Sequence, residues 1–233
     1  MPGAGPIIDH MSRHTVRPSR PELPARAALA SLVLGCGAFA ALAADLLLQG
    51  PVTAADAGVS RWLHRDAGAA FTALMAAFSA VHGTWPLLAM SAAAALALWW
   101  RRQRAWAAAL VLCVPGGMLL NYVVKHAFQR ARPAFDGAAA IASYSFPSGH
   151  AAGATLWWGF MLVWLFAHRA DARTRIAGAT LAAAMVLLTA LSRVYLGAHY
   201  LSDVLAAIGE AAAWLALCFM VLGRRPWNRA TAG

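Results

Sequence analysis

The first residues that could do chemistry lie at 125–133, where Lys125 is followed seven positions later by Arg132 and then by Pro133. Lys125 is the only lysine among the 19 lysines and arginines. Seven residues make two helical turns, so both cations could share a helix face, which Pro133 would bring to an end. An ammonium group and a guanidinium fork are complementary ways to hold a phosphate. The alternative is a pair of interfacial cations that extend from a helix end toward water.

The second group is Pro147-Ser148-Gly149-His150, which comes just before a long apolar run. Proline suits the first turn of a helix, and glycine lets an anion approach the backbone closely. The free N–H groups of a helix N-terminus favour a bound phosphate. His150 could donate a proton to a leaving oxygen there. The alternative is an ordinary helix cap with an incidental histidine.

The third group is Ser192-Arg193, followed by His199 and then by Asp203. His199 and Asp203 are four residues apart, so at the start of a helix they lie on one face within contact distance. A carboxylate behind an imidazole fixes its tautomer and stabilises its charged form. Arg193 adds a third cation for the same anion. The alternative is a buried histidine–aspartate pair that serves only packing.

The three groups together supply cations, two histidines, a carboxylate and a helix N-terminus. No cluster with metal-ligand spacing accompanies them, so we expect side chains to neutralise the phosphate, without a metal or another cofactor. This combination indicates phosphoryl transfer to a histidine.

The elements that must position these groups are membrane spans. Hydrophobic residues make up 61% of the 233 residues, charged residues only 12%, and the mean hydropathy is +0.59. A soluble domain carries roughly 25% charged residues. The net charge of +10 does not indicate a nucleic-acid partner, because the arginines cluster in short segments between apolar runs, as membrane loops do.

The apolar runs predict an all-α bundle of six transmembrane helices, since a span needs about 20 residues. A signal peptide cleaved near Ala41-Leu42-Ala43 is the alternative for the first run, but the run continues to Leu48. Residues 69–81 either pack at the interface or lengthen the second span. The predicted spans are 28–48, 84–100, 105–124, 150–167, 176–191 and 200–222.

Six spans place both termini on one side, together with the basic loops at 101–104 and 168–175. The positive-inside rule makes that side cytoplasmic. We therefore expect three domains: a disordered basic cytoplasmic tail at 1–27, the membrane domain at 28–223 and a short cytoplasmic tail at 224–233. The chemical groups then lie at the extracytoplasmic helix ends, facing the periplasm or exterior of an inner membrane. Six basic residues on that side break the rule and need a local explanation: Arg61, Arg65, Lys125, Arg130, Arg132 and Arg193.

In order and spacing, the three groups resemble the signature of the type 2 phosphatidic acid phosphatases, with no departure at any signature position. The resemblance implies that His199 is the nucleophile and forms a phosphohistidine, that Asp203 orients it, and that His150 is the general acid. It also implies a set of phosphate ligands: Lys125, Arg132, Ser148, Gly149 and Arg193. Soluble vanadate-dependent haloperoxidases share the signature, but six apolar spans argue against them.

The predicted function is therefore hydrolysis of a lipid phosphate or diphosphate whose tail stays in the bilayer. Undecaprenyl diphosphate is the first choice; phosphatidylglycerophosphate, phosphatidate and lipid A phosphates are the alternatives. A transporter that binds phosphate without cleaving it is a candidate from another class, although it needs no histidine–aspartate pair. A non-catalytic membrane scaffold is a third. The sequence does not indicate an oligomeric state.

Four further polar residues stand out. Glu210 lies in the middle of the last span, where it serves either function or hydrogen-bonded packing. Asn121 and His126 flank the first group and could support it. His82 could line the substrate entrance, although a lone histidine is more often structural.

Overall fold

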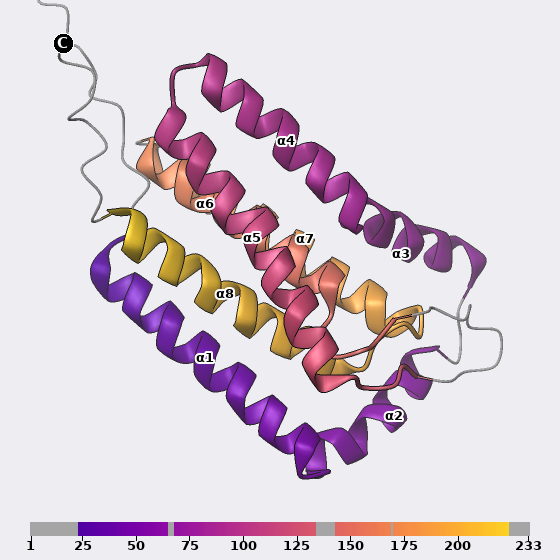
Figure 1. The fold of residues 1–233 in the computed structure, drawn as a ribbon. Coiled ribbons are helices and arrows are strands. Elements are labelled where there is room, and N and C mark those ends of the chain that lie inside the picture. The colour runs from indigo at the N-terminus through magenta and orange to yellow at the C-terminus, as the bar shows by residue number, and fades with distance from the viewer. Residues whose placement is uncertain (1–22, 65–67, 134–142, 169, 224–233) are drawn as a thin grey trace, which may run out of the picture.

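The computed structural model describes residues 23–64, 68–133, 143–168 and 170–223. Every regular element that these residues form is an α-helix, which confirms the predicted fold class. Figure 1 shows long helices running side by side, with the shorter α2 at one end of the bundle. The helices are α1 (Ala25–Leu47), α2 (Pro51–His64), α3 (Ala69–Val81), α4 (Thr84–Trp100), α5 (Arg104–Phe128), α6 (Gly149–Ala167), α7 (Ala172–Tyr195) and α8 (Leu201–Gly223).

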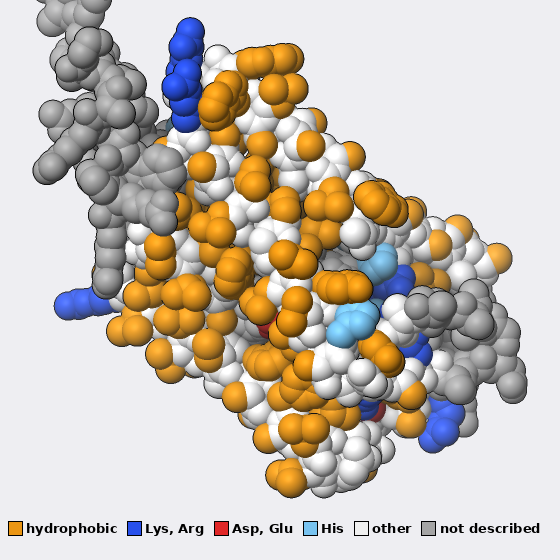
Figure 2. All heavy atoms as spheres, in the orientation of Figure 1, with side chains coloured by type: hydrophobic (Ala, Val, Ile, Leu, Met, Phe, Trp, Pro, Cys, Tyr) orange, Lys and Arg blue, Asp and Glu red, His pale blue; other side chains and the backbone are white. Residues whose placement is uncertain are grey.

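Among the described residues, five helices are long and apolar enough to cross a membrane: α1, α5, α6, α7 and α8. The helices α3 and α4 pass the same test as a pair, bent by 48° at their junction, and give a sixth span if counted as one. Residues 69–81 therefore form a separate helix that meets α4 at a bend, which fits either a broken second span or a re-entrant segment (Figure 1). Hydrophobic side chains cover most of the face in Figure 2, as expected for a surface in contact with lipid.

Several boundaries differ from those predicted. The helix α1 begins at Ala25, inside the predicted N-terminal tail, and α5 continues four residues beyond 124, to Phe128. The helix α7 begins at Ala172 because Asp171 caps it, accepting a hydrogen bond from the Thr174 N–H at 2.7 Å. The rest of the two predicted tails, 1–22 and 224–233, lies outside the described residues.

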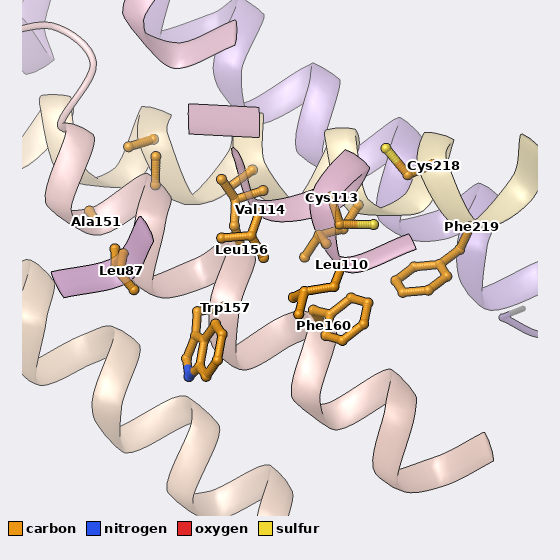
Figure 3. Close-up of a cluster of buried hydrophobic side chains, with 14 of the residues drawn as sticks. Leu87, Leu110, Cys113, Val114, Ala151, Leu156, Trp157, Phe160, Cys218 and Phe219 are labelled. Atoms are coloured by element: carbon orange, nitrogen blue, oxygen red, sulfur yellow. The ribbon is translucent and has the colours of Figure 1, made fainter. Parts of the chain in front are cut away.

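The helix α8 packs against α1, α2, α5, α6 and α7, and lies at the centre of the structure. Gly35 of α1 and Gly209 of α8 meet so closely that a Cβ on Gly35 would lie 2.6 Å from the Gly209 carbonyl oxygen. Small residues at such a crossing let two helix backbones approach in a membrane. Farther along, the buried side chains of Leu110, Phe160 and Phe219 fill the space between α5, α6 and α8 (Figure 3).

His82 fixes the bend between α3 and α4. Its Nε2 accepts a hydrogen bond from the Trp158 indole at 2.9 Å, and its Nδ1 lies 3.0 Å from both the Phe78 carbonyl and the Thr189 hydroxyl. The ring is buried, with 2% exposure. His82 therefore joins the bend to α6 and α7. This position fits a structural role for the histidine rather than a place at the substrate entrance.

We expect Trp158→Phe to destabilise the protein, because it leaves the buried His82 Nε2 without its donor. An unsatisfied buried group costs about 1–3 kcal/mol. For a chain of this size that lowers Tm by about 2–4 °C per kcal/mol, measured by thermal unfolding in detergent. The matched control is Trp85→Phe, because Trp85 is 80% exposed. Equal Tm values for both variants would contradict the role given to His82.

Candidate active site

The three sequence groups meet at one end of the bundle. The chain reaches this end through the segment after α5, the N-terminus of α6, the loop between α7 and α8, and α2 (Figure 1). Lys125, Arg132, Arg193 and His199 all lie close enough to His150 to act on it electrostatically. The two predicted catalytic histidines therefore belong to one cluster.

His199 lies between a carboxylate and a guanidinium. Its Nδ1 is 3.5 Å from Asp203 Oδ2 and 3.4 Å from Ser145 Oγ, and its Nε2 is 3.2 Å from Arg132 Nη1. Asp203 beside Nδ1 favours the tautomer with the proton on Nδ1, which leaves the Nε2 lone pair facing the Arg132 guanidinium. This confirms the predicted contact between His199 and Asp203.

Burial sets the protonation of His199. The ring is 1% exposed, and burial lowers the pKa of His199 to about 3, although Asp203 acts to raise it. The imidazole is therefore neutral near pH 7. Only a neutral ring has a free lone pair on Nε2, so this environment suits a nucleophile.

Arg132 reaches His199 from an extended segment. The helix α5 ends because Gln129 adopts a left-handed conformation with φ 50°. The idea that Lys125 and Arg132 share a helix face is therefore wrong, although the two cations do lie near each other. The guanidinium donates to the Ala198 carbonyl at 2.5 Å and to the Ser143 carbonyl and hydroxyl at 2.8 Å each, which directs it at His199.

Lys125 and Arg193 approach from two further helices. The Lys125 ammonium donates to the Tyr144 carbonyl at 2.9 Å, so it also holds the segment that precedes α6. Arg193 donates to the Ser79 hydroxyl of α3. Its Nε is buried and has no hydrogen-bond partner within the described part of the chain. A buried donor without a partner is costly, and a bound anion would satisfy it.

The helix α6 begins as predicted, with Ser148 as its N-cap. The Ser148 hydroxyl accepts from the Ala151 N–H at 3.5 Å, and the Ser148 N–H donates to the Asp203 carbonyl at 3.1 Å. This second bond ties the start of α6 to the start of α8. The N-terminus of α6, with Gly149 and His150, is thus held beside the cations, where its dipole favours an anion.

Sequence reasoning missed three residues of this site: Asp56, Arg130 and Ser145. Ser145 donates a hydrogen bond to Asp203. Arg130 donates to Asp203 Oδ1 at 2.6 Å and to Asp56 Oδ2 at 2.8 Å. A signal for Arg130 was available, because it breaks the positive-inside rule. Asp56 and Ser145 carry no comparable signal in the sequence.

The remaining polar residues divide into two kinds. Asn121 donates to Glu210 at 2.7 Å, a buried pair between α5 and α8 that fits the packing interpretation of Glu210. His126 is exposed, and its Nδ1 lies 2.8 Å from the Tyr122 carbonyl. Within the described ranges, no group of three or more His, Cys, Asp or Glu could hold a metal ion. Metal independence stays a prediction.

Comparison with known proteins points to one family. The sequence profile of the PAP2 superfamily matches residues 104–227. Phosphatidylglycerophosphatase B of Bacillus subtilis (strain 168) is 34% identical over 123 residues, which cover 52% of this chain and 59% of that relative. The aligned part is thus less than two thirds of the relative's length.

Two solved structures share the fold. The crystal structure of the first transmembrane PAP2 type phosphatidylglycerolphosphate phosphatase from Bacillus subtilis superposes with a TM-score of 0.73, at 22% identity, over 86% of this chain and 98% of that one. The crystal structure of Aquifex aeolicus LpxE superposes with a TM-score of 0.54, at 17% identity, over 72% of this chain and 94% of that one. Both likenesses lie below 25% identity and show that the fold is shared.

We expect Ser145→Ala to lower kcat by about 10-fold or more, because a hydrogen bond to a charged group contributes about 1.5–3 kcal/mol. KM for a lipid phosphate should change little, since Ser145 acts through Asp203. Ser31→Ala is the control: its hydroxyl bonds the Ala212 carbonyl, between α1 and α8. Wild-type kcat in Ser145→Ala would show that this hydroxyl does not orient Asp203.

Proposed function

Because this chain belongs to the PAP2 superfamily, whose sequence profile covers just over half of it, we propose that it is a membrane phosphatase acting on a lipid phosphate through a phosphohistidine at His199. The observation that carries the proposal is the orientation of His199. Its Nδ1 lies beside Asp203, and its Nε2 faces the Arg132 guanidinium at 3.2 Å. The match of the PAP2 superfamily to residues 104–227 confirms the family predicted from the three motifs.

In the first step, the Nε2 lone pair of His199 attacks phosphorus and the bond from phosphorus to the ester oxygen breaks. The leaving oxygen takes a proton from protonated His150, a form that the negative charge of the bound phosphate favours, and departs as the lipid alcohol. The Arg132 N–H that lies on Nε2 in the structure turns to a phosphoryl oxygen, and the Arg193 Nε gains its missing acceptor. These cations stabilise the charge that develops on the phosphoryl oxygens.

In the second step, water attacks the phosphohistidine from the opposite side. Its proton passes to His150, which is neutral after the first step, and the N–P bond breaks with its electron pair returning to Nε2. Asp203 stabilises the positive ring while the intermediate exists. Inorganic phosphate leaves, and both histidines regain their starting states.

Phosphatidylglycerophosphate is the substrate that the comparisons support best. The relative of 34% identity is named a phosphatidylglycerophosphatase, and so is the protein of the structure with TM-score 0.73. Neither comparison supports undecaprenyl diphosphate, the first choice from the sequence. We therefore propose phosphatidylglycerophosphate first and keep undecaprenyl diphosphate, phosphatidate and lipid A phosphates as alternatives.

The test is phosphate release from a panel of these lipids by detergent-purified protein with EDTA present. We expect turnover without added metal and inhibition by vanadate, a phosphate analogue. His199→Ala should lose activity by a factor of at least about 10⁴, as for nucleophiles that act as part of a unit. Substrate labelled with ³²P should leave acid-labile label on the wild-type protein and none on His199→Ala.

Full activity in His199→Ala would refute the nucleophile assignment. Turnover only with added Mg²⁺ would refute the metal-independent mechanism. Lipid phosphate binding without release of phosphate would favour a transporter instead. A preference for undecaprenyl diphosphate in the panel would reverse the order of substrates proposed above.

The chain is a multi-pass membrane protein, and we propose that both termini face the cytoplasm of an inner membrane and the site faces the exterior. Exposed Arg101 and Arg102 lie between α4 and α5, and Arg173 and Arg175 lie at the start of α7. Both places are at the bundle end opposite the cluster around His199 (Figure 1). These four exposed arginines are placed as the positive-inside rule expects.

The orientation predicts the behaviour of two C-terminal fusions expressed in bacteria. Green fluorescent protein, which folds in the cytoplasm, should fluoresce, and alkaline phosphatase, which needs periplasmic disulfides, should be inactive. The opposite pattern would place the site on the cytoplasmic side. A signal from both fusions would mean a mixed orientation and would also contradict the proposal.

A further inference from the structure

Arg130 lies between two buried carboxylates. One terminal nitrogen donates to Asp203 Oδ1 at 2.6 Å and to the Ser202 hydroxyl at 2.7 Å, and the other donates to Asp56 Oδ2 at 2.8 Å. The two carboxylates are 0% and 2% exposed, and Arg130 itself is 10% exposed. Burial acts to lower the pKa of Arg130, but Asp203 and Asp56 outweigh it and raise the pKa.

Asp56 also completes the N-terminus of α8. Its Oδ1 accepts from the Ser202 N–H at 3.0 Å, and its Oδ2 accepts from the Ser202 hydroxyl. The first N–H groups of a helix have no partner within the helix, and a negative charge there is favourable. Asp56 is thus a cap supplied from another helix, α2.

The environment of Arg130 differs from that of the arginines assigned to the phosphate. Both terminal nitrogens of Arg130 already meet carboxylates, and the ring of Tyr200 covers its face at 4.2 Å. Arg193, in contrast, has a buried Nε without a partner among the described residues. Two carboxylates neutralise Arg130 locally, so it offers an incoming anion little attraction.

Asp203 uses its two oxygens for different partners. Oδ1 takes Arg130, whereas Oδ2 takes Ser145, the Tyr200 N–H at 2.9 Å and the Nδ1 side of His199 at 3.5 Å. Rotation of the carboxylate would break bonds at both oxygens. By holding Oδ1, Arg130 therefore also fixes the position of Oδ2, the oxygen that faces His199.

We propose that Asp56 and Arg130 form a positioning clamp, which holds Asp203 and the start of α8 so that Nε2 of His199 points at the phosphorus, and that Arg130 is not a phosphate ligand. This inference rests on the proposed function. It assigns to α2, which carries none of the predicted site residues, the task of fixing the orientation of the nucleophile.

The test separates catalytic rate from anion binding. It compares Asp56→Asn, Arg130→Gln and Arg132→Gln in kcat, KM and the inhibition constant of inorganic phosphate. Asp56→Asn and Arg130→Gln should lower kcat by about 10- to 100-fold, because small misplacements of reacting groups have effects of this size. In Asp56→Asn and Arg130→Gln, the inhibition constant of phosphate should stay within about twofold of the wild-type value. In Arg132→Gln, the same constant should rise by at least about 10-fold.

Two further variants sharpen the comparison. The double variant Asp56→Asn/Arg130→Gln should be about as slow as Arg130→Gln alone, since both residues act through Asp203. Arg130→Lys should recover part of kcat, because a lysine can still pair with one carboxylate. Arg61→Gln is the matched control: Arg61 is an exposed arginine on α2, and its loss should leave kcat unchanged.

The clamp is refuted if Arg130→Gln weakens phosphate inhibition as much as Arg132→Gln does, or if kcat is unchanged in Asp56→Asn and Arg130→Gln. If size-exclusion chromatography shows that Arg130→Gln does not fold, the isosteric variant Asp56→Asn allows the same comparison of kcat with phosphate inhibition. A wild-type protein that hydrolyses no lipid phosphate would refute the proposed function instead. Direct phosphate binding, measured by calorimetry, would then still show whether Arg130 contributes to the anion site.

Discussion

The carboxylate of Asp203 is the group on which the rest of the site depends. It is fully buried, and a buried charge is stable only when it is paired and hydrogen-bonded. Its partners come from distant parts of the chain: Arg130 after α5, Ser145 before α6, and His199 before α8. Asp203 therefore ties together the ends of α5, α6 and α8, and Arg130 extends this connection to Asp56 of α2.

The arginines around this carboxylate fall into two classes. All carry the same charge, but they differ in whether carboxylates are paired with them. Arg130 meets two carboxylates and is locally neutralised. Arg132 and Arg193 approach each other without an equivalent carboxylate, and each acts electrostatically on the half-buried His150. Like charges at close range in a poorly solvated place repel strongly. An anion between them would remove this repulsion, which is the electrostatic basis of the proposed phosphate site.

Sequence reasoning recovered the parts of the structure that follow from local composition. Apolar runs gave the spans, and residue type with spacing gave the three groups, including the contact between His199 and Asp203. It failed where partners are distant in the chain. Asp56 lies 147 positions before Asp203, and no local pattern marks it as the cap of α8. The bend fixed by His82 likewise depends on contacts made only in the folded chain, and no residue pattern marks Gln129 as the left-handed end of α5.

The same division explains why the lipid is harder to infer than the reaction. The polar side chains around His199, such as Asp203, Ser145 and Arg132, are held by directional hydrogen bonds. The lipid tail, in contrast, would meet apolar side chains that make no directional bonds. One methylene in an apolar pocket changes selectivity by only about 1–3 kcal/mol, whereas a hydrogen-bonding site rejects an analogue that lacks its partner far more strongly. Under the proposed function, phosphoryl recognition would therefore depend on a few residues that a sequence motif reveals. Lipid selectivity would depend on many small apolar contacts that no sequence motif marks.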